Sequence, residues 1–167
     1  MSLVLRHDPQ KLGLELDSAG WAPVDELLAG LAKKGRGISF DQLCDIVETN
    51  DKQRYRFNDD KTQIRANQGH SLKLDLQLEP TEPPETLYHG TATRFMKDIN
   101  QQGLQKRNRH HVHLSQDKTT AQSVGQRHGV PVILAIAAGA MRRDGFEFYC
   151  SDNDVWLTDH VPPKYFQ

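Results

Sequence analysis

The first seventy residues contain two stretches in which apolar side chains recur at helical spacing. In the first stretch, four apolar residues follow the i, i+3, i+4, i+7 pattern of one helix face: Val24, Leu27, Leu28 and Leu31. Residues 39–42 then read Ser-Phe-Asp-Gln, a capping box that predicts the start of a second helix. Three apolar residues should form the buried face of that helix: Leu43, Ile46 and Val47.

A β-hairpin is predicted after these helices, because two short alternating segments flank a polar turn at 58–61. Side chains of a strand point alternately to its two faces. If Tyr55, Phe57 and Ile64 face the core, three arginines share the other face: Arg54, Arg56 and Arg65. These arginines either hold an anion or form a solvated polar face. Helices followed by a hairpin indicate a small winged-helix-like lobe over 1–70.

The pattern over 87–167 is typical of a β-rich lobe with two helices. One helix is expected over about 92–102, with Phe95 and Ile99 inward and Gly103 as its stop, and another over about 117–128. Strands are expected at 87–89, 111–115, 132–137, 146–149 and 155–158, and the apolar run at 132–137 is typical of a central strand. The predicted fold class is therefore α+β.

Residues 71–86 separate the two lobes and are predicted to form a linker. Three prolines and three glutamates crowd the second half of this segment. Proline lacks a backbone N–H and stiffens the chain, so such a segment suits a connection between lobes. The expected organisation is a first lobe over 1–70, a linker over 71–86 and a second lobe over 87–167.

Composition limits the kinds of partner that the chain can have. Its 21 Lys and Arg residues and 22 Asp and Glu residues give a formal net charge of −1, whereas a protein that grips long duplex nucleic acid by charge is usually basic. A local cluster at a single phosphate fits this balance better. With no apolar run near the ~20 residues of a membrane span, we expect a cytoplasmic protein. Cys44 and Cys150 lack metal-site spacing, and we expect two buried, reduced thiols.

Two clusters of donors have the composition of phosphate-binding sites. Arg6 and His7 precede Asp8-Pro9, so they should lie at a helix end. A guanidinium fork beside an imidazole suits a phosphate, although cations at a helix C-terminus also simply favour the helix dipole. The segment 65–71 packs further donors around Gly69, as either a ligand loop or a polar turn.

In the second lobe, His89-Gly90-Thr91 is predicted to join a strand to a helix through a glycine turn, a plausible seat for a ribose or pyrophosphate. Neither GxGxxG nor GxxxxGK[ST] occurs, so no Rossmann or P-loop site is indicated. Arg127 should lie near the end of the helix at 117–128. His110, His111 and His113 suggest a metal, but the ligand spacing is poor and we expect none. The neighbouring basic residues Lys106, Arg107 and Arg109 either face RNA or are solvated.

Seven segments resemble, in the same order, the NAD-dependent RNA (tRNA) 2′-phosphotransferase family. They are LVLRHDP at 3–9, GLELDSAGW at 13–21, RANQGHS at 65–71, LYHGT at 87–91, HVHLS at 111–115, SVGQRHG at 123–129 and VWLTDHVPPKY at 155–165. One RHDP would be a weak signal, but seven ordered motifs over nearly the whole chain are highly specific. The family usually has more helix before its LRH element, whereas only Met1 to Val4 precede it here, so either the first helix is shortened or the chain starts late.

The resemblance implies a winged-helix RNA lobe joined to an ADP-ribosyltransferase-like NAD lobe, with the active site in the cleft. The catalytic quartet of the family falls on four residues: Arg6, His7, Arg65 and Arg127. Its NAD-binding positions fall on His89, Gly90, Thr91, Leu114 and Ser115. The residues expected to line the cleft on the RNA side are Gln68, Gly69, His70 and Ser71.

The implied reaction removes an internal 2′-phosphate from RNA, such as one left at a tRNA splice junction, by transferring it to NAD⁺ as co-substrate. It passes through an ADP-ribosylated RNA 2′-phosphate and gives 2′-hydroxyl RNA, ADP-ribose 1″,2″-cyclic phosphate and nicotinamide. We expect a monomer that uses no metal and contacts RNA but no membrane. Two alternatives are an ADP-ribosyltransferase acting on phosphorylated nucleic-acid ends and a non-catalytic RNA-binding module.

Overall fold

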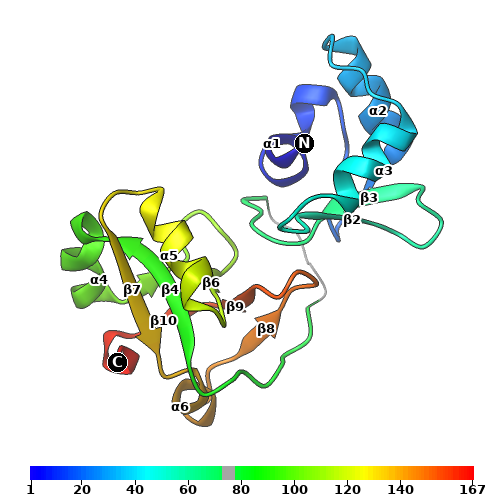
Figure 1. The fold of residues 1–167 in the computed structure, drawn as a ribbon. Helices are drawn as coiled ribbons and strands as arrows, with labels where there is room; N and C mark the ends of the chain where they lie inside the picture. The colour runs from blue at the N-terminus through cyan, green and yellow to red at the C-terminus, as the bar shows by residue number, and fades with distance from the viewer. Residues whose placement is uncertain (73–77) are drawn as a thin grey trace. The chain divides into compact units, whose positions relative to one another are not determined.

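A computed structural model describes residues 1–72 and 78–167, and the chain divides into two compact units, Met1–Gln77 and Leu78–Gln167 (Figure 1). The division falls within the segment 71–86 that the sequence predicts as a linker. Residues 73–77 of that segment lie outside the described part of the chain. Helices and strands occur in both, which confirms the α+β class, while the winged-helix-like and ADP-ribosyltransferase-like assignments stay predictions.

The first unit packs three helices and a short 3-10 helix around a small antiparallel sheet (Figure 1). Its strands lie in the order β1-β3-β2. In chain order the elements are α1 (Ser2–Arg6), η1 (Pro9–Leu12), β1 (Ala22–Pro23), α2 (Val24–Lys33), α3 (Phe40–Glu48), β2 (Tyr55–Phe57) and β3 (Gln63–Ala66). The sheet thus places the two strands that carry arginines, β2 and β3, side by side.

The two predicted helices of this unit are confirmed as α2 and α3. Ser39 accepts a hydrogen bond from the backbone N–H of Gln42, and the Gln42 side chain accepts one from the backbone N–H of Ser39. Leu43 is fully buried in the core of the unit and Val47 packs against it. The prediction for Ile46 was wrong, since 39% of its surface is exposed. The core touches a narrower stripe of α3 than the apolar spacing suggested.

The predicted hairpin is confirmed, and its register places Arg56 directly opposite Arg65 and Phe57 opposite Ile64. Ile64 is buried in the core and Phe57 packs against it, as expected from the alternation of the strands. Arg56 and Arg65 therefore share the opposite face. The Arg54 guanidinium contacts the side chain of Asn50, with 3.4 Å between Nη1 and Oδ1.

The second unit contains two small antiparallel sheets and an additional strand pair (Figure 1). One sheet is β4-β7, the other is β6-β9-β8, and β10 pairs with β5. The strands are β4 (Leu87–Ala92), β5 (Leu104–Gln105), β6 (Val112–Leu114), β7 (Pro131–Ile136), β8 (Phe148–Cys150), β9 (Trp156–Thr158) and β10 (His160–Val161). The helices are η2 (Thr93–Phe95), α4 (Met96–Gln102), α5 (Lys118–Gln126), α6 (Ala138–Arg143) and η3 (Pro163–Tyr165).

Most of the predicted elements of this unit are confirmed, but β7 is not a central strand. It pairs with β4 on one side, and on the other the C-terminal segment adds a bridge between Ile136 and Phe166. Ile133 in β7 keeps 37% of its surface exposed. An apolar run of this length is compatible with either position in a sheet, so composition alone could not decide it.

Residues 78–86, from the predicted linker, make defined contacts with the second unit. The backbone N–H of Thr81 donates to the carbonyl of Phe148 at 2.7 Å, and Pro83 is buried. Glu85 accepts two hydrogen bonds from Arg143, at 2.7 and 3.1 Å. None of the described helices is long and apolar enough to cross a membrane.

Candidate functional site

The end of α1 presents Arg6 and His7, as the following Asp8-Pro9 predicted. Helix α1 ends at Arg6 and His7 is its cap residue. The preceding Leu5 is fully buried, so it anchors this helix end in the core of the unit. Arg6 is half-buried and His7 is exposed. An anchored backbone that carries a half-buried arginine and an exposed histidine is suited to binding an anion.

The segment after β3 returns to this helix end. Gly69 has a φ of +84°, a left-handed conformation that favours glycine, and His70 is fully buried. Ser71 then donates its backbone N–H to the carbonyl of Arg6 at 3.0 Å, and its hydroxyl lies 3.0 Å from Nδ1 of His7. Ser71 therefore ties the predicted RNA-side segment, with Gly69 and His70, to the helix end that carries Arg6 and His7. Gln68 precedes this turn and is half-buried.

Arg65 is held by two groups from the segment before β1. Its side chain is 6% exposed, and Nη1 donates to the carbonyl of Ala19 at 3.3 Å. The guanidinium carbon lies 4.7 Å from the centre of the Trp21 ring. Arg56 approaches the same ring at 5.3 Å. The structure thus gathers two guanidiniums on one indole, and no functional role for Trp21 was predicted from the sequence.

Gly90 and Thr91 do not form the glycine turn that the sequence predicts. Both lie within β4, where Gly90 pairs with Ile133 and Thr91 with Val132. A Cβ atom at Gly90 would overlap the carbonyl oxygen of Ala121 in α5. The glycine is required for the close packing of α5 on β4, and a local turn signal could not reveal this tertiary contact.

Gly125 serves the same helix–strand contact from the other side. A Cβ atom at Gly125 would lie 2.6 Å from the carbonyl oxygen of Thr91. Figure 1 shows α5 lying along the β4-β7 sheet. One glycine in each of two motifs, LYHGT and SVGQRHG, therefore lets this helix approach the sheet backbone.

The imidazole ring of His89 has a defined orientation. Its Nδ1 lies 3.0 Å from the carbonyl oxygen of His113, and because a carbonyl only accepts, Nδ1 carries the proton. Burial lowers the pKa of His89 below its usual value, and the charge of Arg109 lowers it further against the opposing effect of this hydrogen bond. Nε2 is then the acceptor atom of the ring, suited to a hydroxyl group.

The second predicted NAD segment lies beside the first. Tyr88 and Ser115 form a backbone bridge, with N–H to carbonyl distances of 2.7 and 2.8 Å. The Ser115 hydroxyl lies 3.1 Å from the backbone nitrogen of Asp117, the residue that caps α5. Leu114, next to Ser115, is buried in β6. The polar groups of His89, Thr91 and Ser115 are thus distributed over two adjacent segments of one unit.

A family model described as "RNA 2'-phosphotransferase, Tpt1 / KptA family" matches residues 1–160. The chain belongs to this RNA 2′-phosphotransferase family. A relative from Flavobacterium johnsoniae is 57% identical over 167 residues, which cover 100% of this chain and 92% of the relative. Another from Nostoc punctiforme is 53% identical over 167 residues, with coverage of 100% and 92%. A third from Pseudomonas fluorescens is 56% identical over 163 residues, with coverage of 97% and 90%. All three carry the name probable RNA 2'-phosphotransferase.

For a member of this family, the predicted quartet is divided between the two units. Arg6, His7 and Arg65 belong to the first unit, where α1 packs against β3. Arg127 belongs to the second and is the exposed cap residue at the C-terminal end of α5, as predicted from its position near a helix end. The convergence of all four side chains stays a prediction.

The histidines after the basic loop have neighbours other than metal ligands. His111 packs on Tyr149 with ring centres 5.3 Å apart, and Arg109 lies 3.4 Å from Nδ1 of His113. Over residues 1–72 and 78–167, no group of three or more His, Cys, Asp or Glu side chains is arranged to hold a metal. Lys106 forms an ion pair with Asp159. The two cysteines are free and half-buried rather than fully buried as predicted.

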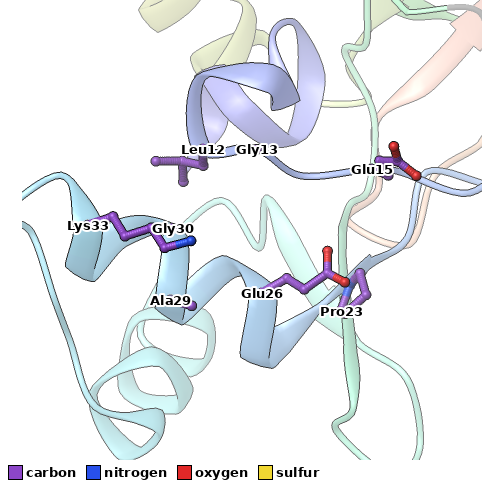
Figure 2. Close-up of a pocket in the computed structure, with 8 residues that line it drawn as sticks. All are labelled: Leu12, Gly13, Glu15, Pro23, Glu26, Ala29, Gly30 and Lys33. Atoms are coloured by element: carbon purple, nitrogen blue, oxygen red, sulfur yellow. The ribbon is translucent and has the colours of Figure 1, made fainter.

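A hollow of about 520 Å³ in the first unit lies elsewhere (Figure 2). It is lined by Leu12, Gly13, Glu15, Pro23, Glu26, Ala29, Gly30 and Lys33. Among the residues that the structure describes, this lining includes none of the predicted site residues. Its two carboxylates and single ammonium are poorly suited to a phosphate, so the hollow is not a candidate for the RNA site.

Proposed function

We propose that this protein removes an internal 2′-phosphate from RNA by transferring it to NAD⁺. Membership of the RNA 2′-phosphotransferase family over nearly the whole chain carries the proposal. The phosphate donors of the first unit support it physically. Arg6, His7 and Ser71 are joined by hydrogen bonds, and Arg65 is fixed against Trp21. Charge-assisted bonds from guanidinium groups are the strongest that a protein can offer to a phosphate.

The second unit offers groups that fit NAD⁺, which is a co-substrate of this reaction. Neutral His89 has Nε2 as an acceptor for a ribose hydroxyl. Thr91 and Ser115 add hydroxyl groups to the proposed NAD⁺ site. Buried Leu114, the neighbour of Ser115, completes the proposed NAD⁺ segments. Gly90 contributes by letting α5 lie close to β4, which fixes the strand that carries His89 and Thr91. We propose that no metal takes part.

The first step forms a bond between RNA and the nicotinamide ribose. An oxygen of the RNA 2′-phosphate attacks C1″, the bond from C1″ to the nicotinamide nitrogen breaks, and its electron pair neutralises the departing ring. The nucleophile is already an anion, so a strong general base is unnecessary. Arg6 and Arg65 orient the phosphate and hold it beside the reacting carbon.

The second step releases the RNA. The ribose 2″-oxygen attacks phosphorus, the bond from phosphorus to the RNA 2′-oxygen breaks, and the hydroxyl proton ends on that RNA oxygen. We propose that His7 moves this proton and that Arg65 and Arg127 stabilise the negative charge on the phosphoryl oxygens. The products are 2′-hydroxyl RNA, ADP-ribose 1″,2″-cyclic phosphate and nicotinamide.

The same proposal assigns the architecture: a winged-helix-like RNA lobe in the first unit, an ADP-ribosyltransferase-like lobe in the second, and a monomer in solution. The helices and hairpin of residues 1–66 and the paired sheets with α5 in the second unit support it. Analytical ultracentrifugation of the full chain would contradict the last part if it gave a dimer mass.

The test uses a synthetic oligonucleotide with one internal 2′-phosphate, incubated with the protein in the presence and absence of NAD⁺. The proposal expects loss of the phosphate and one nicotinamide released per RNA, only with NAD⁺. If a 5′-phosphorylated oligonucleotide incubated in parallel with NAD⁺ instead retains ADP-ribose at its end, and the internal 2′-phosphate is not removed, the protein is an ADP-ribosyltransferase of nucleic-acid ends. Binding without release of nicotinamide would make it an RNA-binding module.

A further inference from the structure

A turn before β1 brings an indole and a carbonyl to the same guanidinium. Resting on the proposed function, we infer that Trp21 is a positioning residue that holds Arg56 and Arg65 as a paired clamp for the RNA 2′-phosphate. Arg56 is then a further phosphate-binding residue. The guanidinium carbons lie 5.3 and 4.7 Å from the Trp21 ring centre. Trp21 belongs to the segment GLELDSAGW, to which the proposed mechanism gives no role.

The turn that carries Trp21 is closed by one carboxylate. Oδ1 of Asp17 accepts the backbone N–H groups of Ala19 and Trp21, both at 2.9 Å. The backbone N–H of Asp17 donates to the carbonyl of Trp21 at 3.0 Å, and Gly20 has a φ of +84°. Two groups that contact Arg65, the Ala19 carbonyl and the Trp21 ring, thus come from a single turn.

Placing two arginines side by side is unfavourable unless neighbouring groups offset the repulsion between their charges. Arg56 and Arg65 are directly opposite on adjacent antiparallel strands, where like charges destabilise a sheet. The face of the Trp21 ring attracts both guanidiniums and offsets part of this repulsion. An anion bound between or beside the two forks would reduce this repulsion further. The arrangement is therefore suited to binding concentrated negative charge.

The kind of anion follows from the charge of the pair. A phosphate monoester such as the RNA 2′-phosphate carries about −1.5 to −2 charges near neutral pH. The phosphodiesters of the RNA backbone carry one each. Two guanidiniums match a monoester better, so the clamp selects the 2′-phosphate over the surrounding backbone. Their planar forks also favour bidentate contacts that a lysine cannot make.

Arg54 provides a matched control on the same hairpin. It has the same charge and lies two residues from Arg56, but its guanidinium contacts the side chain of Asn50. Because charge-assisted hydrogen bonds contribute about 1.5–3 kcal/mol each, we expect Arg56→Gln to lower kcat/KM for the phosphorylated oligonucleotide by ~10–100-fold. Arg54→Gln should change it by less than about 2-fold, because a polar contact of this kind outside the clamp contributes little.

The variants of Trp21 separate positioning from simple packing. Trp21→Phe keeps an aromatic face, whereas Trp21→Leu removes it. Each cation–π contact contributes about 0.5–2 kcal/mol and Trp21 makes two, so Trp21→Leu should lose ~5-fold or more in kcat/KM and Trp21→Phe should recover most of it. The KM for NAD⁺ should stay unchanged in all of them. A thermal melt of each variant identifies any that fails to fold, and Arg56→Gln then decides the question.

Fluorescence tests the clamp independently of activity. The chain has two tryptophans, so Trp156→Phe in the second unit leaves Trp21 as the reporter. The fluorescence is titrated without NAD⁺ to give the Kd of each oligonucleotide. The oligonucleotide with a 2′-phosphate should have a Kd at least 10-fold lower than the same oligonucleotide without it, and Arg56→Gln should abolish the difference. Equal responses to both oligonucleotides, or equal activities of Arg56→Gln and Arg54→Gln, would overturn the clamp. A phosphate-specific response in a protein that releases no nicotinamide would support the clamp while refuting the proposed function.

Discussion

The two units hold their candidate arginines in different ways. In the first, Arg65 is buried, bonded to the Ala19 carbonyl and stacked on Trp21. In the second, Arg127 is exposed at the end of α5. A guanidinium fixed before the ligand arrives loses little freedom on binding, whereas an exposed one must be ordered by it. Two arginines of the same predicted quartet therefore need not have the same role.

The largest effect should follow from removing the fixed arginine. Loss of one preorganised donor at a reacting phosphate costs about 3–4 kcal/mol, or ~100–1000-fold in rate. We therefore expect Arg65→Ala to lower kcat by that factor and Arg65→Lys to recover little of it, because a point charge cannot replace a fork. At the exposed Arg127, lysine should recover more. Steady-state assays of the four variants check this, and equal rescue at both positions would remove the contrast.

The glycines of the second unit give the next effect, on stability rather than on chemistry. In Gly90→Ala the new Cβ would overlap the Ala121 carbonyl, so α5 must move away from β4. Overpacking typically costs about 1–3 kcal/mol, and a clash with backbone should lie at or above that limit. The control is Gly37→Ala, where the nearest atom is 3.4 Å from the new Cβ. If thermal unfolding is unchanged in Gly90→Ala, the close packing is not required.

Features that depend on residues near in sequence could be predicted, whereas features that depend on distant residues could not. The capping box at Ser39 and the shared hairpin face of Arg56 and Arg65 could be predicted, because both depend on residues near in sequence. Gly90 was misassigned to a turn because its partner, Ala121, is thirty-one residues away by number. The role of Trp21 likewise depends on a strand far along the chain.

A smaller effect is expected at the hydroxyls proposed for NAD⁺. Net hydrogen-bond contributions of about 0.5–1.5 kcal/mol correspond to ~2–10-fold. Ser115→Ala and Thr91→Val should raise the KM for NAD⁺ by that factor and leave the KM for RNA nearly unchanged. The control is Ser123→Ala, whose hydroxyl donates to the Thr119 carbonyl within α5. A rise in the KM for RNA instead would assign these residues to the other substrate.

The smallest effect concerns pH and separates the units again. Burial lowers the pKa of His89, so the folded state binds its proton more weakly than the unfolded state, whose value is near ~6.5. The stability of the second unit is then complete above that pH and declines as pH falls below it. His111 shifts in the same direction through burial. Denaturant unfolding at pH 7.5 and 5.5 should show a smaller loss for His89→Asn than for wild type, and an identical loss would exclude His89.

We propose that the arginines of the first unit clamp the phosphate that reacts. The decisive experiment is a single-turnover time course with Arg65→Ala, NAD⁺ and end-labelled 2′-phosphorylated RNA, resolved by gel electrophoresis alongside nicotinamide release. Step two places more negative charge on the phosphoryl oxygens, so in Arg65→Ala nicotinamide release should slow less than product formation. RNA carrying ADP-ribose on its 2′-phosphate should then accumulate as a slower-migrating band. Equal slowing of both steps, with no such band, would contradict this assignment.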